Sequence, residues 1–127
     1  MVIHNEHAPE TYKSLISIST EALKAFQWLN GGAVVAMLTY VGHHSELATA
    51  AEYPLAWFVG GLVAASAAFI TSYLTQLALY NEDIQGKDFQ GPRHGYLLWT
   101  TLIVAALSLV SFGIGAFSAI HVLAHCN

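Results

Sequence analysis

Three long stretches without charged residues dominate the pattern of the chain. Asp, Glu, Lys and Arg occur only within residues 6–24, 46–52 and 82–93. The stretches between and after these blocks reach the length of roughly 20 residues that an α-helix needs to cross a bilayer. The pattern therefore predicts an all-α integral membrane protein with three transmembrane helices. The predicted spans are residues 25–42, 54–80 and 96–124.

The segment before the first predicted span is amphipathic. Within residues 1–24, Tyr12, Leu15, Ile16 and Leu23 recur at the spacing of one helical face, and Lys and Glu lie around the other. We expect an interfacial or cytoplasmic lead-in helix that continues into the first span. The rest of this single domain is expected to comprise an outer loop at 43–53, a cytoplasmic loop at 81–95 and an outer tail at 125–127.

The run Asn30-Gly31-Gly32 lies inside the first predicted span and is typical of a turn in a soluble protein. A break there would leave too few apolar residues for a crossing. Lipid also penalises unpaired backbone groups, and membrane helices carry more Gly than soluble ones. We therefore expect a continuous helix, with a shallow re-entrant turn at Asn30 as the alternative.

The basic residues predict the orientation of the chain. Lys13, Lys24, Lys87 and Arg93 all lie on the side shared by the N-terminus and the second loop. Because cytoplasmic loops carry an excess of Lys and Arg, this side is expected to be cytoplasmic. The C-terminus is then expected on the outer, periplasmic face.

Composition narrows the possible function classes. Only 9% of the 127 residues are charged and 55% are hydrophobic, whereas a soluble domain has about 25% charged residues. The net charge of −4 provides no basic patch for nucleic-acid phosphates, so no nucleic-acid partner is expected. Motifs of nucleophilic, phosphate-binding and metalloprotease sites are missing from the sequence, so we expect no enzyme activity.

Small residues along the spans predict where helices approach one another. Stripes of Gly, Ala and Ser let backbones come close, and packing with modest hydrogen bonds then holds helices together in lipid. The stripes could serve packing within the chain, or they could join identical subunits or a larger partner. The residues expected at close helix contacts are Asn30, Gly31, Gly32, Gly60, Gly61, Ala64, Ser111 and Gly115.

A polar layer is expected in the inner third of the membrane if Ala25, Tyr80 and Tyr96 mark the inner boundary. Such groups seek partners where water is absent, so Gln27 and Gln76 are predicted to bridge helices. The alternative is a water-accessible vestibule or small pore. The expected members are Gln27, Asn30, Ser72, Thr75, Gln76, Thr100 and Thr101.

Four histidines are expected together on the outer face. His43 and His44 follow the first span, and His121 and His125 lie one helical turn apart near the end of the third. An i, i+4 His pair can bind a transition metal, and facing histidines can ligate haem. The simpler interpretation is that these side chains meet water and headgroups, so no cofactor is expected.

The run Leu29-Asn30-Gly31-Gly32-Ala33, with Ser72-Tyr73-Leu74-Thr75-Gln76 later in the chain, resembles a group of small three-span bacterial inner-membrane proteins of unassigned function. The resemblance covers most of the chain loosely. It implies a bacterial inner-membrane setting and carries no activity with it.

These observations together predict a non-catalytic membrane protein that packs laterally, with lipid and with its own copies or other membrane subunits as partners. It would act as a homo-oligomer or as an accessory subunit of a larger complex. Two alternatives remain open: a pore-forming effector of the holin or toxin type, and an outer-face metal or haem binder.

Overall fold

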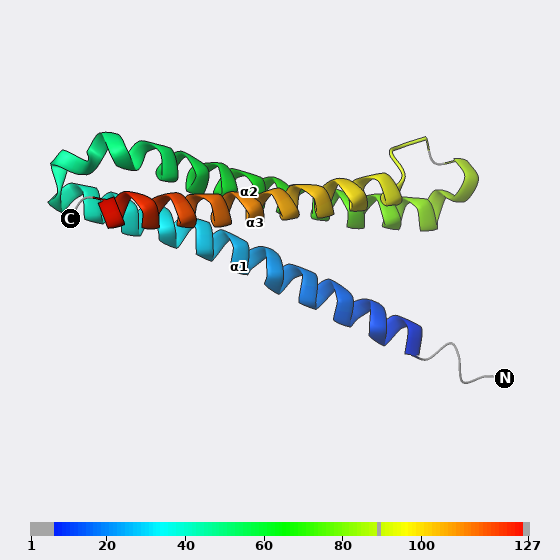
Figure 1. The fold of residues 1–127 in the computed structure, drawn as a ribbon. Coiled ribbons are helices and arrows are strands. Elements are labelled where there is room, and N and C mark those ends of the chain that lie inside the picture. Colours follow the sequence, from blue (N-terminus) through cyan, green and yellow to red (C-terminus); the bar gives the residue numbers. More distant parts are fainter. Residues whose placement is uncertain (1–6, 89, 126–127) are drawn as a thin grey trace.

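Three long helices account for nearly all of the chain in its computed structural model, which describes residues 7–88 and 90–125. The helices are α1 (His7–His43), α2 (Ala48–Gln85) and α3 (His94–His125), and two 3₁₀ turns lie between them, η1 (Ser45–Leu47) and η2 (Gly86–Asp88) (Figure 1). The described residues contain no strand. The predicted all-α class with three helices is confirmed.

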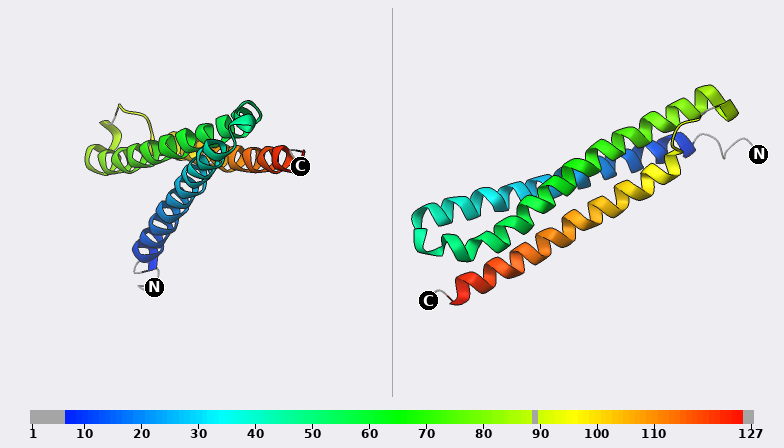
Figure 2. Two further views of the ribbon diagram at one scale, coloured as in Figure 1. Left: turned by 90° about the vertical axis from the view of Figure 1, so that its left-hand side faces the viewer. Right: turned by 90° about the horizontal axis from the view of Figure 1, so that it is seen from above.

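α2 and α3 form a long antiparallel pair from which α1 diverges. α3 packs mainly along α2, whereas α1 contacts α2 more than α3. Figures 1 and 2 show α1 close to the pair near η1 and farther from it toward its own N-terminal end. The fold is therefore a helical hairpin with a third helix splayed away at the end where η2 lies.

α1 is continuous through Asn30-Gly31-Gly32, as predicted, and no re-entrant turn occurs there. The Asn30 side chain donates to the carbonyl of Phe26, one turn earlier on the same helix, at 3.0 Å. This local hydrogen bond leaves the backbone ladder intact. The helix also makes the lead-in and the first predicted span one rigid element, as expected from the amphipathic pattern.

The first loop is shorter than the expected 43–53. α1 reaches His43, and α2 already begins at Ala48, with Pro54 inside the helix rather than at its start. A proline costs the helix one hydrogen bond, here to the carbonyl of Ala50. Because Ala50 is exposed, its carbonyl can bond to water instead, so the helix tolerates Pro54 in its second turn.

The second loop is also shorter than the expected 81–95. α2 continues through Asn81 to Gln85 and ends at Gly86, whose φ of +56° lies in the left-handed region that glycine adopts most readily. α3 then begins at His94. The charged residues Glu82 and Asp83 therefore belong to α2. A polar helical turn that extends beyond a hydrophobic span costs little free energy.

Two helical segments are long and apolar enough to cross a membrane, Ser45–Gln85 and His94–His125. α1 is not one of them. Its polar residues, Gln27 and Asn30 among them, lower the mean hydropathy of its central part. Length and composition thus support two of the three predicted spans.

Candidate functional site

A buried amide joins the three helices where α1 comes closest to the pair. Asn30 on α1 is 0% exposed, and its Nδ2 donates to Ser108 Oγ on α3 at 3.2 Å. Ser108 Oγ in turn donates to the carbonyl of Gly61 on α2 at 2.8 Å. One short chain of hydrogen bonds therefore connects all three elements.

Gly61 makes this contact possible because it has no side chain. A Cβ at this position would overlap Oδ1 of Asn30 and lie 2.6 Å from its Cγ, which is closer than atoms can pack. Oδ1 of Asn30 is buried and has no hydrogen-bond partner among the described residues. It faces the Cα–H of Gly61, a weak donor of the kind that recurs at helix interfaces.

A second close contact lies nearer the η1 end of the bundle. Gly115 on α3 packs against the ring of Phe58 on α2, and a Cβ at Gly115 would lie 2.9 Å from two ring carbons. The Phe58 ring also packs against Phe112, with centroids 5.7 Å apart. Phe58 and Gly115 are both buried, so the α2–α3 pair is close-packed here.

The predicted packing residues therefore differ in how closely they approach another helix. Asn30, Gly61 and Gly115 lie at close contacts between helices, whereas a Cβ at Gly31 would meet only Leu62 at 3.7 Å. Ala64 and Ser111 are half-buried. Gly32 and Gly60 are exposed, and nothing lies within 4 Å of a Cβ at either. These two glycines therefore make no close contact within the chain, and their predicted role in helix packing stays a prediction for contacts with another subunit.

The expected polar layer is not one layer. Gln27 Nε2 on α1 donates to Ser66 Oγ on α2 at 3.3 Å, at the level of Asn30. Gln76 Oε1 accepts from Tyr12 OH at 3.2 Å much farther along α2. Both glutamines bridge helices, as predicted, but the ten residues from Ser66 to Gln76 separate them by about 15 Å. The lead-in runs beside α2 and α3, so Ala25 is not level with Tyr80.

The remaining polar residues bind locally or between α2 and α3. Thr101 Oγ1 donates to Thr71 Oγ1 across this pair at 2.9 Å. Thr75 donates to the carbonyl of Thr71 at 2.7 Å, and Thr100 to that of Tyr96 at 3.0 Å, each on its own helix. Ser72 is half-buried at the groove described next. These contacts satisfy the hydroxyl protons within a helix or between α2 and α3.

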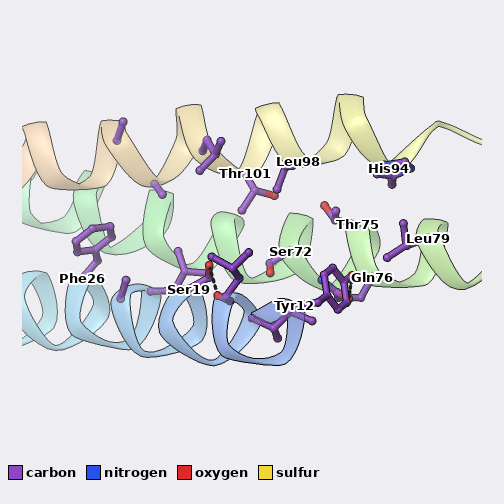
Figure 3. Close-up of a pocket in the computed structure, with 17 residues that line it drawn as sticks. Tyr12, Ser19, Phe26, Ser72, Thr75, Gln76, Leu79, His94, Leu98 and Thr101 are labelled. Carbon is purple, nitrogen blue, oxygen red and sulfur yellow. Dashed lines mark hydrogen bonds between the residues drawn. The ribbon is translucent and has the colours of Figure 1, made fainter. Parts of the chain in front are cut away.

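The splayed part of α1 leaves a groove of about 620 Å³ against α2 and α3 (Figure 3). Most of its lining is apolar. The Gln76 amide and the His94 imidazole lie toward one end, and Ser19, Ser72 and Thr101 lie nearer the middle (Figure 3). The lining residues are Tyr12, Leu15, Ile16, Ser19, Ala22, Leu23 and Phe26 of α1, Ser72, Thr75, Gln76 and Leu79 of α2, and His94, Leu98, Thr101, Leu102, Ala105 and Ala106 of α3. Such a volume is typical of small-ligand sites in proteins.

Glu82 and His94 form an acid–imidazole pair at the end of the groove nearest η2, where His94 is part of the lining. Glu82 Oε1 accepts the backbone N–H of His94 at 2.8 Å, and its Oε2 lies 2.6 Å from Nδ1 of the same residue. The hydrogen bond from that backbone N–H, aided by the one from the imidazole, lowers the pKa of the Glu82 carboxyl below its usual value of 4.5. Glu82 thus caps the N-terminus of α3, where negative charge is stabilising.

His43, His44, His121 and His125 are all exposed, and the rings of three of them lie within hydrogen-bonding distance of a carbonyl one helical turn earlier. Nδ1 of His43 lies 2.8 Å from the carbonyl of Thr39, and Nδ1 of His125 lies 2.8 Å from that of His121. His44 stacks on the Tyr40 ring, with centroids 4.5 Å apart. Within residues 7–88 and 90–125, no three or more His, Cys, Asp or Glu side chains are placed to hold a metal ion. The metal and haem hypotheses therefore gain no support.

Sequence reasoning missed the partners of the predicted polar residues. Ser66 and Tyr12 complete the bridges to Gln27 and Gln76, and Ser108 receives the Asn30 amide. The available signal was that a buried amide needs a partner and that a serine in the small-residue face of the third span can supply one. No such signal identifies Ser66 and Tyr12 as the partners of the two glutamines, because these pairings depend on how α1 is offset along α2.

No family model, no curated protein and no solved structure matches this chain.

Proposed function

We propose that this chain is a non-catalytic integral membrane protein with three spans that packs laterally, as a homo-oligomer or as an accessory subunit of a larger membrane assembly. The proposal rests on the exposure of the large apolar side chains. Large apolar side chains cover the outside of all three helices, with Trp28 79% and Phe117 76% exposed. In water, patches of this size bind partners or aggregate, whereas lipid solvates them.

The central part of α1 serves as the third span in this proposal, although its mean hydropathy is modest. The polar side chains that lower the average, Gln27 and Asn30, bond to α2 and α3 rather than facing outward. The outer face of the same stretch carries Trp28, Val35 and Leu38, all exposed. A hydropathy average over all residues of a helix therefore underestimates how apolar its outer face is.

The proposed orientation has the N-terminal end of α1 and η2 in the cytoplasm of a bacterial inner membrane. The η2 turn and the N-terminal end of α1 lie at the same end of the bundle, and the η1 turn lies at the other (Figure 1). Arg93 precedes α3 at the first of these ends and Lys13 lies on the first turns of α1. The positive-inside rule supports this placement, and the resemblance to small three-span proteins supports the bacterial setting.

Lateral packing is supported by small residues that packing within the chain leaves unused. Gly32 on α1 and Gly60 on α2 are exposed on the outer surface. Exposed glycines allow another helix to approach closely in lipid, where packing rather than a hydrophobic force drives association. These positions are therefore the proposed contacts with a second copy or another subunit.

The test is the size of the particle extracted from native membranes with a membrane-scaffolding polymer. A particle holding several copies, or one copy with other subunits, is expected. Gly60→Leu should reduce the particle size, whereas Ala56→Leu, at an exposed position one turn earlier on α2, serves as the matched control. A particle that holds a single chain of this protein alone would refute lateral packing, whatever its variants do.

A further inference from the structure

The four Glu and Lys residues of α1 lie on the side of the helix away from the groove. Because successive residues are turned by 100°, Glu10, Lys13, Glu21 and Lys24 fall within an arc of about 80°, and Ser17 lies at its centre. All five residues are exposed, and none of them lines the groove. These five residues are called the charged face of α1 below.

The two signs of charge are separated within the charged face. Glu10 and Glu21 lie along one edge of it, and Lys13 and Lys24 lie along the other, because the spacing Glu-x-x-Lys recurs after eleven residues. Eleven residues make close to three helical turns, so the second Glu–Lys pair lies in line with the first at a distance of about 16.5 Å. The face therefore has an acidic edge and a basic edge that run side by side along the helix.

The charged face runs beside an apolar part of α2. The hydrogen bonds from Gln27 to Ser66 and from Tyr12 to Gln76 place the residues between Tyr12 and Gln27 beside α2 between those two levels. Residues 53–81, which include both levels, contain no Asp, Glu, Lys or Arg. Ionisable side chains beside such a stretch rarely face lipid and instead pair with one another or face a neighbouring helix.

Contacts within the chain satisfy these charges only in part. Nζ of Lys24 donates to Oε1 of Glu21 at 3.0 Å, yet the two side chains remain 52% and 69% exposed. An ammonium has three donors and a carboxylate has about four acceptor positions, so one bond leaves capacity on both groups. The splay of α1 also leaves its outer side uncovered by α2 and α3 (Figure 2). A partner for this side must offer acids to the basic edge and bases to the acidic edge.

A second copy of the chain meets this requirement by symmetry. Two copies in one membrane that are related by a two-fold axis along the membrane normal present the same face to each other. With Ser17 near the axis, the rotation brings the acidic edge of one copy against the basic edge of the other. Glu21 of each copy then lies opposite Lys24 of the other, and Glu10 lies opposite Lys13. The charged face is therefore complementary to itself.

From these features we propose that α1 pairs through its charged face with α1 of a second copy, in a parallel arrangement held by reciprocal Glu–Lys ion pairs. The inference rests on the proposed lateral packing and names the partner in it. Trp28 and Gly32 continue the same side of α1 toward η1, and both are exposed. Because a glycine allows a neighbouring helix to approach closely, Gly32 of one copy provides room for Trp28 of the other.

The experiment is disulfide cross-linking between copies of the full-length chain in native membranes, in a Cys126→Ser background. Ser17→Cys places a thiol at the centre of the charged face, whereas Ser19→Cys places one at the groove. Oxidation with copper phenanthroline is expected to join two chains through position 17 and not through position 19. Glu21→Lys gathers four cations at the pair of sites and Lys24→Glu gathers four anions. Because like charges across an interface repel strongly, each reversal should reduce cross-linking at least about tenfold.

Co-expression of the two reversal variants with different tags separates contacts between copies from contacts within one. Both variants lose the bond between Glu21 and Lys24 inside the chain, and mixing them cannot restore it. Mixing does place the new lysine of one copy opposite the new glutamate of the other. Cross-linked heterodimers are therefore expected at the wild-type level, while homodimers of each variant stay low. Asp83→Lys, an exposed reversal on α2, is the matched control and should leave cross-linking unchanged.

Recovery in the mixture also shows that both variants fold and insert. All variants keep Lys13, Lys87 and Arg93, which preserve the basic residues of the cytoplasmic side. Equal cross-linking through positions 17 and 19, or no recovery in the mixture, would overturn pairing through the charged face. If extracted particles still hold several copies in that case, lateral packing stands and uses another surface. A particle with a single chain alone would refute both proposals.

Discussion

Replacing Gly61 by Ala should destabilise the bundle, whereas the same change at the neighbouring Gly60 should not. The new methyl at Gly61 would meet the amide of Asn30, at 2.6 Å from its Cγ, and that side chain is 0% exposed and bonded to Phe26 and Ser108. At Gly60 the methyl would meet nothing within 4 Å. Both variants gain the same helix propensity, up to about 1 kcal/mol over glycine.

The difference between the two variants therefore isolates the steric cost. Overpacking of a close-packed core costs about 1–3 kcal/mol, which is roughly a 5- to 150-fold difference in the unfolding equilibrium constant. The assay is reversible unfolding in mixed micelles titrated with sodium dodecyl sulfate and followed by circular dichroism. Equal stability of Gly61→Ala and Gly60→Ala would refute the packing described for Asn30.

A double variant locates the cost more sharply. Asn30→Ala removes the amide that the Gly61 methyl would strike, so Asn30→Ala with Gly61→Ala should be less destabilised than the sum of the two single changes. The interaction free energy in this cycle is expected to be of order 1 kcal/mol or more. Additive effects would mean that the methyl clashes with something other than Asn30.

Three further predictions concern the other contacts. Ser108→Ala should destabilise the fold by roughly 0.6–1.7 kcal/mol because it removes an interhelical hydrogen bond in a membrane setting; Ser118→Ala, on the same helix and half-buried, is the control in the same titration, and equal effects would contradict the role of Ser108. Gly115→Ala should also destabilise, since its methyl would lie 2.9 Å from the Phe58 ring, and Phe58→Leu in the same chain should restore part of the loss; an unrelieved loss would point to another neighbour. Glu82→Gln should lower the melting temperature at neutral pH. Because the pKa of Glu82 is lowered by folding, its charge stabilises the fold above about pH 4.5, and this contribution disappears as the pH falls through the lowered folded value. The difference from wild type should therefore vanish in acid, and a constant difference, or the same pH dependence in Asp83→Asn, would argue against the cap.

The sequence predicts the helices well and their relative positions poorly. The absence of charge over three stretches requires three long apolar segments, and the penalty for breaking a helix in lipid favours continuity at Asn30-Gly31-Gly32. The N-terminal end of α2 is missed because Pro54 is typical of the first turn of a helix, yet lies inside this one. The C-terminal end is missed because Asn81 to Gln85 are polar enough to resemble a loop.

The candidate site is harder to predict because it depends on tertiary contacts. Gly60 and Gly61 are adjacent, but successive residues point about 100° apart on a helix, and nothing in the local sequence indicates which one faces Asn30. The hydrogen bond from Tyr12 to Gln76 sets the level of α1 against the pair, and the splay of α1 creates the groove. Hydrophobic patterns specify faces of helices, not this offset along their axes.

The number of membrane crossings is tested most directly by the sides on which the two ends of the chain lie. A membrane-impermeant maleimide can be applied to intact spheroplasts and to inverted vesicles, with Cys126 as the C-terminal probe and Ser14→Cys in a Cys126→Ser background as the N-terminal probe. Three spans predict labelling of Cys126 only in spheroplasts and of the cysteine at position 14 only in inverted vesicles. Labelling of both probes from the same side would contradict α1 as a span, and recovery of the folded chain in a detergent-free supernatant would contradict the membrane setting itself.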